Sequence, residues 1–131
     1  MINIIFPMAG EGSRFGYDFK PFLPLADLTF IEKAIEPFVK HIDSIKKFYF
    51  VVTKTQEEKY GVRERLELIL DVPFEVIIIP EKTEGPYQTI KNAIAANPQI
   101  KEHPGVICDC DHSIDVDYIF ANYETSECII P

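Results

Sequence analysis

The chain has 131 residues, enough for one domain that buries roughly two-thirds of the surface it exposes when unfolded. Its composition, 47% hydrophobic and 26% charged, is typical of a globular protein and excludes disorder along the whole chain. A net charge of −8 excludes the basic surface that nucleic-acid and anionic-membrane binding require, so we expect neither partner.

Short apolar runs alternate with helical periodicities along the chain. Residues 2–6 form an apolar run rich in β-branched side chains, which predicts a buried strand. From Thr29 the apolar residues recur at helical spacing, which predicts a helix to about His41. The same patterns predict further strands at 48–52, 74–79 and from 105 to 108 or 109, and helices at 55–70 and 87–96.

This alternation predicts an α/β fold of the Rossmann-like kind. We expect three layers, with an open, mostly parallel sheet that carries helices on both faces. Ligands of such sheets bind beyond the carboxyl ends of the strands. In this chain the loops at those ends are 7–20, 80–86 and 109–115, and they contain the unusual residues.

The loop after the first strand carries two glycines and two cations. Gly10 and Gly12 let the backbone approach phosphate oxygens closely. Arg14 can hold two oxygens at once, and Lys20 adds a point charge at the far end of the loop. The loop lacks the Lys-Ser/Thr pair of a P-loop and the third glycine of a dinucleotide fingerprint. We therefore expect a phosphate site of another kind.

A strand, a glycine loop, Arg14 and the segment Lys20-Pro21-Phe22-Leu23-Pro24-Leu25 together resemble the signature of sugar nucleotidyltransferases with the nucleotide-diphospho-sugar transferase fold. The resemblance implies that residues 1–131 are the N-terminal, nucleotide-binding part of such an enzyme, with the second half absent. It makes Arg14 and Lys20 the catalytic cations at the phosphates. It assigns the remaining phosphate contacts to the loop residues Ala9, Gly10, Glu11, Gly12 and Ser13.

The next strand ends extend the resemblance. Gly85, before a predicted helix, is similar to the family's base-recognition turn, although a helix start with proline in first position explains it equally well. Asp111 matches the family's metal-binding aspartate, and the implied cofactor is Mg²⁺, which prefers carboxylate oxygens and substrate phosphates. A zinc site is disfavoured because Cys108 and Cys110 lack the usual zinc spacing.

The resemblance implies transfer of a nucleoside monophosphate from a nucleoside triphosphate to a sugar 1-phosphate or a similar small phosphorylated acceptor, with release of pyrophosphate. Two alternatives remain open. One is a metal-dependent glycosyltransferase of related fold that uses Asp109 and Asp111 as an Asp-x-Asp motif. The other is a regulatory domain that binds nucleotide without turnover.

The remaining expectations concern the setting of the protein. An odd number of cysteines, three, and the absence of a signal-peptide pattern predict a cytoplasmic protein. Residues 127–131 resemble a strand with an uncovered apolar edge, so we expect the chain to form homo-oligomers. With the second half absent, we expect weak nucleotide binding and little turnover from these 131 residues.

Overall fold

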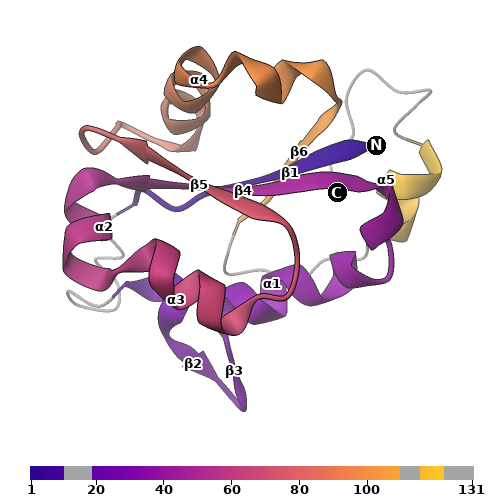
Figure 1. Cartoon of the computed structure of the whole chain (residues 1–131), viewed down its shortest axis with the longest axis horizontal. Coiled ribbons are helices and arrows are strands. Elements are labelled where there is room, and N and C mark those ends of the chain that lie inside the picture. Colours follow the sequence, from indigo (N-terminus) through magenta and orange to yellow (C-terminus); the bar gives the residue numbers. More distant parts are fainter. Residues whose placement is uncertain (11–18, 110–115, 123–131) are drawn as a thin grey trace.

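A parallel sheet forms the centre of the structure, a computed structural model that describes residues 1–10, 19–109 and 116–122 (Figure 1). Its strands are β1 (Ile2–Pro7), β4 (Ile45–Thr53), β5 (Phe74–Ile79) and β6 (Gly105–Ile107). In the described part of the chain they lie in the order β5-β4-β1-β6, and every neighbouring pair is parallel. The strands predicted at 2–6, 74–79 and 105–108 are confirmed, and the one predicted at 48–52 begins three residues earlier, at Ile45.

Helices cover both faces of this sheet, which confirms the predicted three-layer α/β fold (Figure 1). The helices are α1 (Phe30–Val39), α2 (Lys54–Tyr60), α3 (Val62–Ile69), α4 (Pro86–Ala96) and α5 (Asp117–Asn122), with short 3-10 helices η2 (Lys20–Phe22), η3 (Ile42–Ser44) and η4 (Pro98–Glu102). Residues of α1, α3 and α5 pack on one face, and residues of α4 and η4 pack on the other. Among the described residues, no helix is both long enough and apolar enough to cross a membrane.

The alternation of side chains along β1 builds the two halves of the core. Successive strand residues point to opposite faces, so Phe6 and Ile5 enter different clusters. Phe6 stacks on Phe50 of β4 with ring centroids 5.4 Å apart and meets Phe38 of α1 edge-on at 6.3 Å. Ile5 packs instead with the cluster that contains Ile90 of α4. β1 is therefore buried on both faces, as its mostly apolar sequence predicted.

The single helix predicted over 55–70 is wrong, because the chain forms two helices there. Gly61 ends α2 in the left-handed region, at φ 57° and ψ 51°, and α3 begins at the next residue. The break turns Val62 and Leu66 into the core, where neither is measurably exposed. The periodicity of the segment could not reveal this change of direction, because α2 is almost entirely polar and the apolar stripe lies in α3.

A small hairpin was not predicted. β2 (Pro24–Leu25) and β3 (Leu28–Thr29) pair antiparallel and project from the body of the structure (Figure 1). Two-residue strands are too short to show a period of two in the sequence. The hairpin leads into α1 through Thr29, whose hydroxyl accepts from the Glu32 amide at 3.3 Å while the Glu32 carboxylate accepts from the Thr29 amide at 3.1 Å.

The strand order identifies where a ligand is expected. From β1 the chain moves outward to β4 and β5 and then returns to place β6 on the other side of β1. The connection that follows β1 therefore runs toward one edge of the sheet, and the connection that follows β5 runs back to β6 at the opposite edge. In open α/β sheets this change of direction opens a crevice at the carboxyl ends of the two strands. The loops that follow β1 and β6 begin at that crevice.

Replacing Gly61 by alanine should destabilise the fold. An alanine Cβ would meet no described heavy atom within 4 Å, so the cost, about 1–2 kcal/mol, comes from the left-handed backbone alone. Gly85→Ala is the matched control, since Gly85 is extended and its surroundings are equally open. Urea unfolding should show a loss for Gly61→Ala only; equal free energies of unfolding for both variants would contradict this account.

Candidate nucleotide site

The backbone after β1 is held to the sheet as far as Ala9 and becomes accessible at Gly10. The Met8 amide donates to the Val51 carbonyl at 2.8 Å, and Met8 and Ala9 are both 3% exposed. Gly10 is exposed, and a Cβ added there would meet no described atom within 4 Å. Its carbonyl accepts from Nε2 of Gln56 at 3.0 Å. A ligand can thus approach the described start of the predicted loop.

Most of the remaining predicted loop lies outside the described residues. This applies to the residues assigned to the phosphates by resemblance, namely Glu11, Gly12, Ser13 and Arg14. The structure describes the loop again from Phe19. The roles given to these four residues stay predictions.

Lys20 occupies a place that is fixed by aromatic packing. It is half-buried and begins η2. Phe19 before it stacks on Tyr60 of α2 with centroids 5.1 Å apart, and Phe22 meets Phe19 edge-on at 5.1 Å. The Arg65 guanidinium covers the Phe22 ring at 4.1 Å. The backbone of Lys20 is therefore anchored by buried rings on either side, which suits a residue whose charge must be delivered to one position.

The chain after β6 stays against β1 for one more residue and then turns acidic. The Cys108 amide donates to the Ile5 carbonyl at 2.9 Å, and Asp109 follows as an exposed residue. Burial, with a smaller effect from the Asp109 charge, raises the pKa of the Cys108 thiol to about 12. The carboxylate of Asp109 is the described oxygen donor that follows Cys108, and carboxylate oxygens are donors that suit Mg²⁺.

The metal ligand predicted from the sequence cannot be placed. Asp111 lies outside the described residues, and so does the second cysteine of the zinc alternative, Cys110. Within residues 1–10, 19–109 and 116–122, no group of three or more His, Cys, Asp or Glu side chains could hold a metal ion. The carboxylate of Asp109 is the described donor nearest in sequence to Asp111.

Gly85, the predicted base-contacting residue, has its carbonyl held by two threonines. The Thr83 hydroxyl donates to it at 2.9 Å, and the Thr89 backbone amide donates to it at 3.1 Å as the first bond of α4. The Thr89 hydroxyl lies 3.2 Å from the same carbonyl and also hydrogen-bonds with the Thr83 hydroxyl. Gly85 itself is extended, with φ 176° and ψ 178°, and immediately precedes Pro86 at the start of α4. The helix start with proline in first position, one of the two explanations given for Gly85 from the sequence, is thus present. The base contact of Gly85 stays a prediction.

A polar hollow of about 440 Å³ lies beside Gly85 at the carboxyl end of β5. It is lined by Pro80, Glu81, Lys82, Thr83, Glu84, Gln88 and Asn92. Gln88 and Asn92 lie one helical turn apart on α4, and the Gln88 amide donates to Asn92 Oδ1 at 2.8 Å. The sequence analysis did not assign these two amide side chains to a site. The available signal was that Gln88 and Asn92 lie four residues apart in the helix predicted after Gly85.

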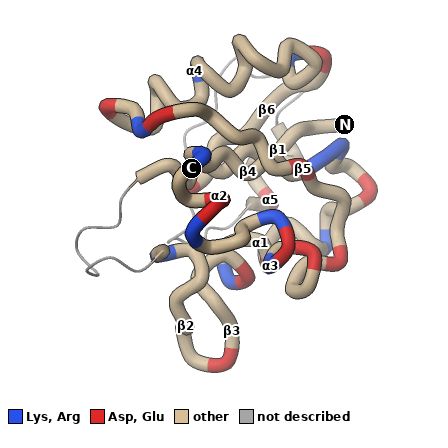
Figure 2. Tube along the Cα trace, turned by 60° about the vertical axis from the view of Figure 1, so that its left-hand side comes forward, with Lys and Arg blue, Asp and Glu red and all other residues tan. Residues whose placement is uncertain are grey.

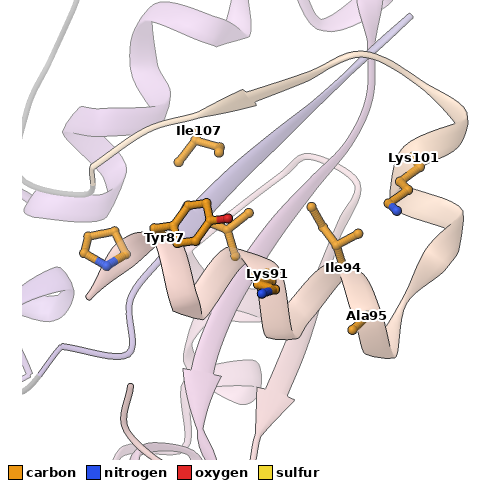
Figure 3. A pocket seen from close by; sticks show the side chains of 8 residues that line it. Tyr87, Lys91, Ile94, Ala95, Lys101 and Ile107 are labelled. Atoms are coloured by element: carbon orange, nitrogen blue, oxygen red, sulfur yellow. The ribbon is translucent and has the colours of Figure 1, made fainter. Parts of the chain in front are cut away.

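A larger, apolar hollow of about 640 Å³ lies along α4 (Figure 3). It is lined by Pro86, Tyr87, Ile90, Lys91, Ile94, Ala95, Lys101 and Ile107. One end, at Tyr87 and Ile107, reaches the carboxyl ends of the strands, and the other lies near Lys101, before β6 begins. Its walls are mostly apolar, so they offer few groups to a triphosphate, and the glycine loop remains the better candidate for the phosphates.

The surface charge gives no broad attraction for an anion. Basic and acidic residues are interspersed along α3, and an acidic residue lies at the turn of the β2–β3 hairpin (Figure 2). Together with the net charge of −8, this means that any phosphate ligand would have to be held by local groups rather than by the overall field of the protein.

The sequence as a whole identifies the family. Residues 5–130 match the family of MobA-like NTP transferase domains, and the chain belongs to that family. The match covers all three carboxyl-end loops. No curated protein sequence matches the chain.

Solved structures of similar fold are sugar nucleotidyltransferases. A nucleoside-diphosphate-sugar pyrophosphorylase from Vibrio cholerae is 23% identical, with a TM-score of 0.65 over 82% of this chain and 47% of that one. A putative glucose-1-phosphate thymidylyltransferase from Bacillus anthracis is 19% identical, with a TM-score of 0.75 over 97% and 52%. An apo UDP-glucose pyrophosphorylase is 18% identical, with a TM-score of 0.69 over 98% and 56%. The chain spans about half the length of each, and these likenesses confirm the fold.

Cys108 should resist alkylation in the folded protein. With a pKa of about 12, only roughly one thiol in ten thousand is ionised at about pH 8. Peptide mapping after iodoacetamide treatment should show Cys108 unlabelled in native protein and labelled in urea. Because the unfolded thiol ionises near pH 9, its burial stabilises the fold below that pH, and the contribution is lost as the pH rises towards 12. Equal labelling rates in both states would show that the thiol is not buried.

Proposed function

We propose that this protein transfers a nucleoside monophosphate from a nucleoside triphosphate to a sugar 1-phosphate or a similar small phosphorylated acceptor and releases pyrophosphate. One observation carries the proposal: the exposed Gly10 follows β1 beside the carboxyl end of β6, in a chain of an NTP transferase family. Membership of that family favours this reaction over the glycosyltransferase alternative.

The phosphates would lie on the loop that follows β1. Backbone amides from Gly10 onward would hold the triphosphate, and Arg14 would stabilise the departing pyrophosphate. Lys20, anchored through its aromatic neighbours, would offset the negative charge on the oxygens around the α-phosphorus. The attacking group is a phosphate oxygen of the acceptor, so no protein nucleophile is required. Catalysis would consist of positioning and charge stabilisation.

The base would lie in the polar hollow beside Gly85. Gln88 and Asn92 line that hollow with amide groups, which can both donate and accept hydrogen bonds. A purine or pyrimidine edge presents donors and acceptors of the same kind. The hollow and the glycine loop follow β5 and β1, which flank β4 at the same end of the sheet.

Asp111 would hold Mg²⁺, with Asp109 close by in the chain. Carboxylate oxygens are donors that Mg²⁺ prefers, and both aspartates would supply them. When bound, the ion would supply positive charge at the phosphates, as is usual in phosphate sites. The protein residues would then need to orient the triphosphate rather than neutralise all of its charge.

Binding of triphosphate should require a divalent metal. The net charge of −8 and a loop with two cations leave most of the triphosphate charge uncompensated without one. Calorimetry with each common nucleoside triphosphate should show binding with Mg²⁺ and little or none in excess chelator. Equal affinity under both conditions would remove the metal, and Asp111 with it, from the proposed site. Binding without pyrophosphate release in the presence of sugar 1-phosphates would support the regulatory alternative.

Lys20→Ala should lower the rate of pyrophosphate release far more than it lowers nucleotide affinity. A charge beside the reacting phosphate acts mainly in the transition state, and its loss costs about one to three orders of magnitude in rate. Lys46→Ala is the matched control, since Lys46 is exposed near the amino end of β4, at the opposite end of the sheet. The experiment uses a preparation in which the wild-type protein releases pyrophosphate. If Lys20→Ala then keeps the wild-type rate, as Lys46→Ala should, the catalytic role assigned to Lys20 is wrong.

A further inference from the structure

Gln56 joins the end of β4 to the glycine loop after β1. It belongs to α2, is 9% exposed, and lies 46 residues from Gly10 in sequence. Its side-chain Nε2 donates to the Gly10 carbonyl at 3.0 Å, and its Oε1 accepts from the Thr53 amide at 2.9 Å. Both ends of the carboxamide are therefore occupied. Nε2 can only donate and Oε1 can only accept, so the two backbone partners are compatible with this orientation of the side-chain amide and not with the flipped one.

A second helix of the same protein shows what the amide group of Gln56 adds. Thr29 and Glu32 form the same reciprocal cap at the start of α1 that Thr53 and Gln56 form at the start of α2. A glutamate completes that cap equally well, since only a side-chain oxygen is needed to accept from the backbone amide. The cap alone therefore does not need a glutamine at position 56. The Nε2 group, which a carboxylate lacks, is the part that reaches Gly10.

The bond selects a direction for the Gly10 carbonyl. Gly10 is exposed, so water could satisfy this carbonyl in other orientations, and a glycine has unusual freedom to adopt them. In a planar trans peptide the carbonyl and the following N–H point in opposite directions. Holding the carbonyl toward Gln56 therefore fixes the plane of the Gly10 peptide, and the proposed function assigns the backbone from Gly10 onward to the phosphates.

In the loop after β5, side chains also contact the carbonyl of a glycine. The Gly85 carbonyl is held by the hydroxyls of Thr83 and Thr89, and Thr89 is 3% exposed. The strands before these two glycines, β1 and β5, flank β4 in the same sheet. The Gly85 carbonyl also accepts from the Thr89 backbone amide at 3.1 Å, the first bond of α4, so the helix itself contributes to its direction. At Gly10 the carbonyl is contacted by the side chain of Gln56.

We propose that Gln56 is a positioning residue of the nucleotide site, which orients the Gly10 peptide for the triphosphate through its carboxamide. The inference rests on the proposed function for the identity of the ligand. It assigns a role to a residue outside the glycine loop and beyond the residues singled out in the sequence. The advantage is preorganisation: the loop loses less freedom on binding because part of its backbone is already held.

Four variants separate the Gly10 bond from the cap of α2. Gln56→Met removes the Nε2 donor without adding charge, and Gln56→Glu removes it while keeping the oxygen that the cap requires. Thr53→Ala breaks the cap from its other side and leaves the bond to Gly10 possible. Glu32→Gln is the distant control. It makes the reverse change, glutamate to glutamine, at the equivalent position of the α1 cap.

The measurements are calorimetric titration with Mg²⁺ and each common nucleoside triphosphate, thermal unfolding, and amide hydrogen exchange of the ligand-free peptide containing Gly10. Both Gln56 variants should bind the triphosphate about three- to tenfold more weakly, the effect of one hydrogen bond, and should exchange faster around Gly10. Thr53→Ala should lower Tm but keep wild-type affinity and exchange. Glu32→Gln should keep both as well.

The outcomes distinguish this inference from the function on which it rests. If wild-type protein binds triphosphate and Gln56→Met binds it equally well, Gln56 has no positioning role. A loss of affinity in Thr53→Ala as large as in Gln56→Met would trace the effect to the cap of α2 and would also overturn the inference. If the wild type binds no triphosphate at all, the proposed function fails, and with it the ligand that Gln56 is inferred to serve.

Discussion

The position of β1 at the centre of the sheet is the constraint on which the rest of the structure depends. Its backbone groups are paired on one side with β4 and on the other with β6, and its side chains are buried on both faces. A strand enclosed in this way can expose only its ends. Whatever chemistry the chain performs near β1 must therefore come from the loop that leaves its carboxyl end, where Gly10 first reaches solvent.

The same packing explains how flexible loop residues acquire definite positions. Gly10 and Gly85 have little conformational preference of their own, and both carbonyls are held by polar side chains from adjacent helices or loops. Lys20 is charged and long, yet its backbone is anchored by the rings of Phe19 and Phe22. The apolar core and a few buried polar groups together provide the rigid support that a phosphate site requires.

The solved structures of similar fold are about twice as long as this chain, and they match 82 to 98% of it. The family membership concerns nucleoside triphosphates, which agrees with the accessible Gly10 after β1 and the exposed Asp109 after β6.

The sequence by itself determined the class of fold, most strand positions and the family. The strands β1 and β5 appear as short, mostly apolar runs rich in β-branched residues. Pro86 after Gly85 marks the start of α4 because proline suits a first helical turn. Sequence order alone also placed three loops at one end of the sheet, since the carboxyl ends of parallel strands lie together. These features depend on local composition and on general rules of chain topology.

Only the tertiary structure decided the break at Gly61, the strand order and the partners of the polar side chains. The break depends on how Val62 and Leu66 reach the core, which no periodicity within the segment reveals. The Thr53 and Gln56 pair is a local pattern, but the partner of the Gln56 amide group is Gly10, 46 residues away. Such contacts form because β1 and β4 pair side by side, and that pairing is set by burial across the whole chain rather than by neighbouring residues.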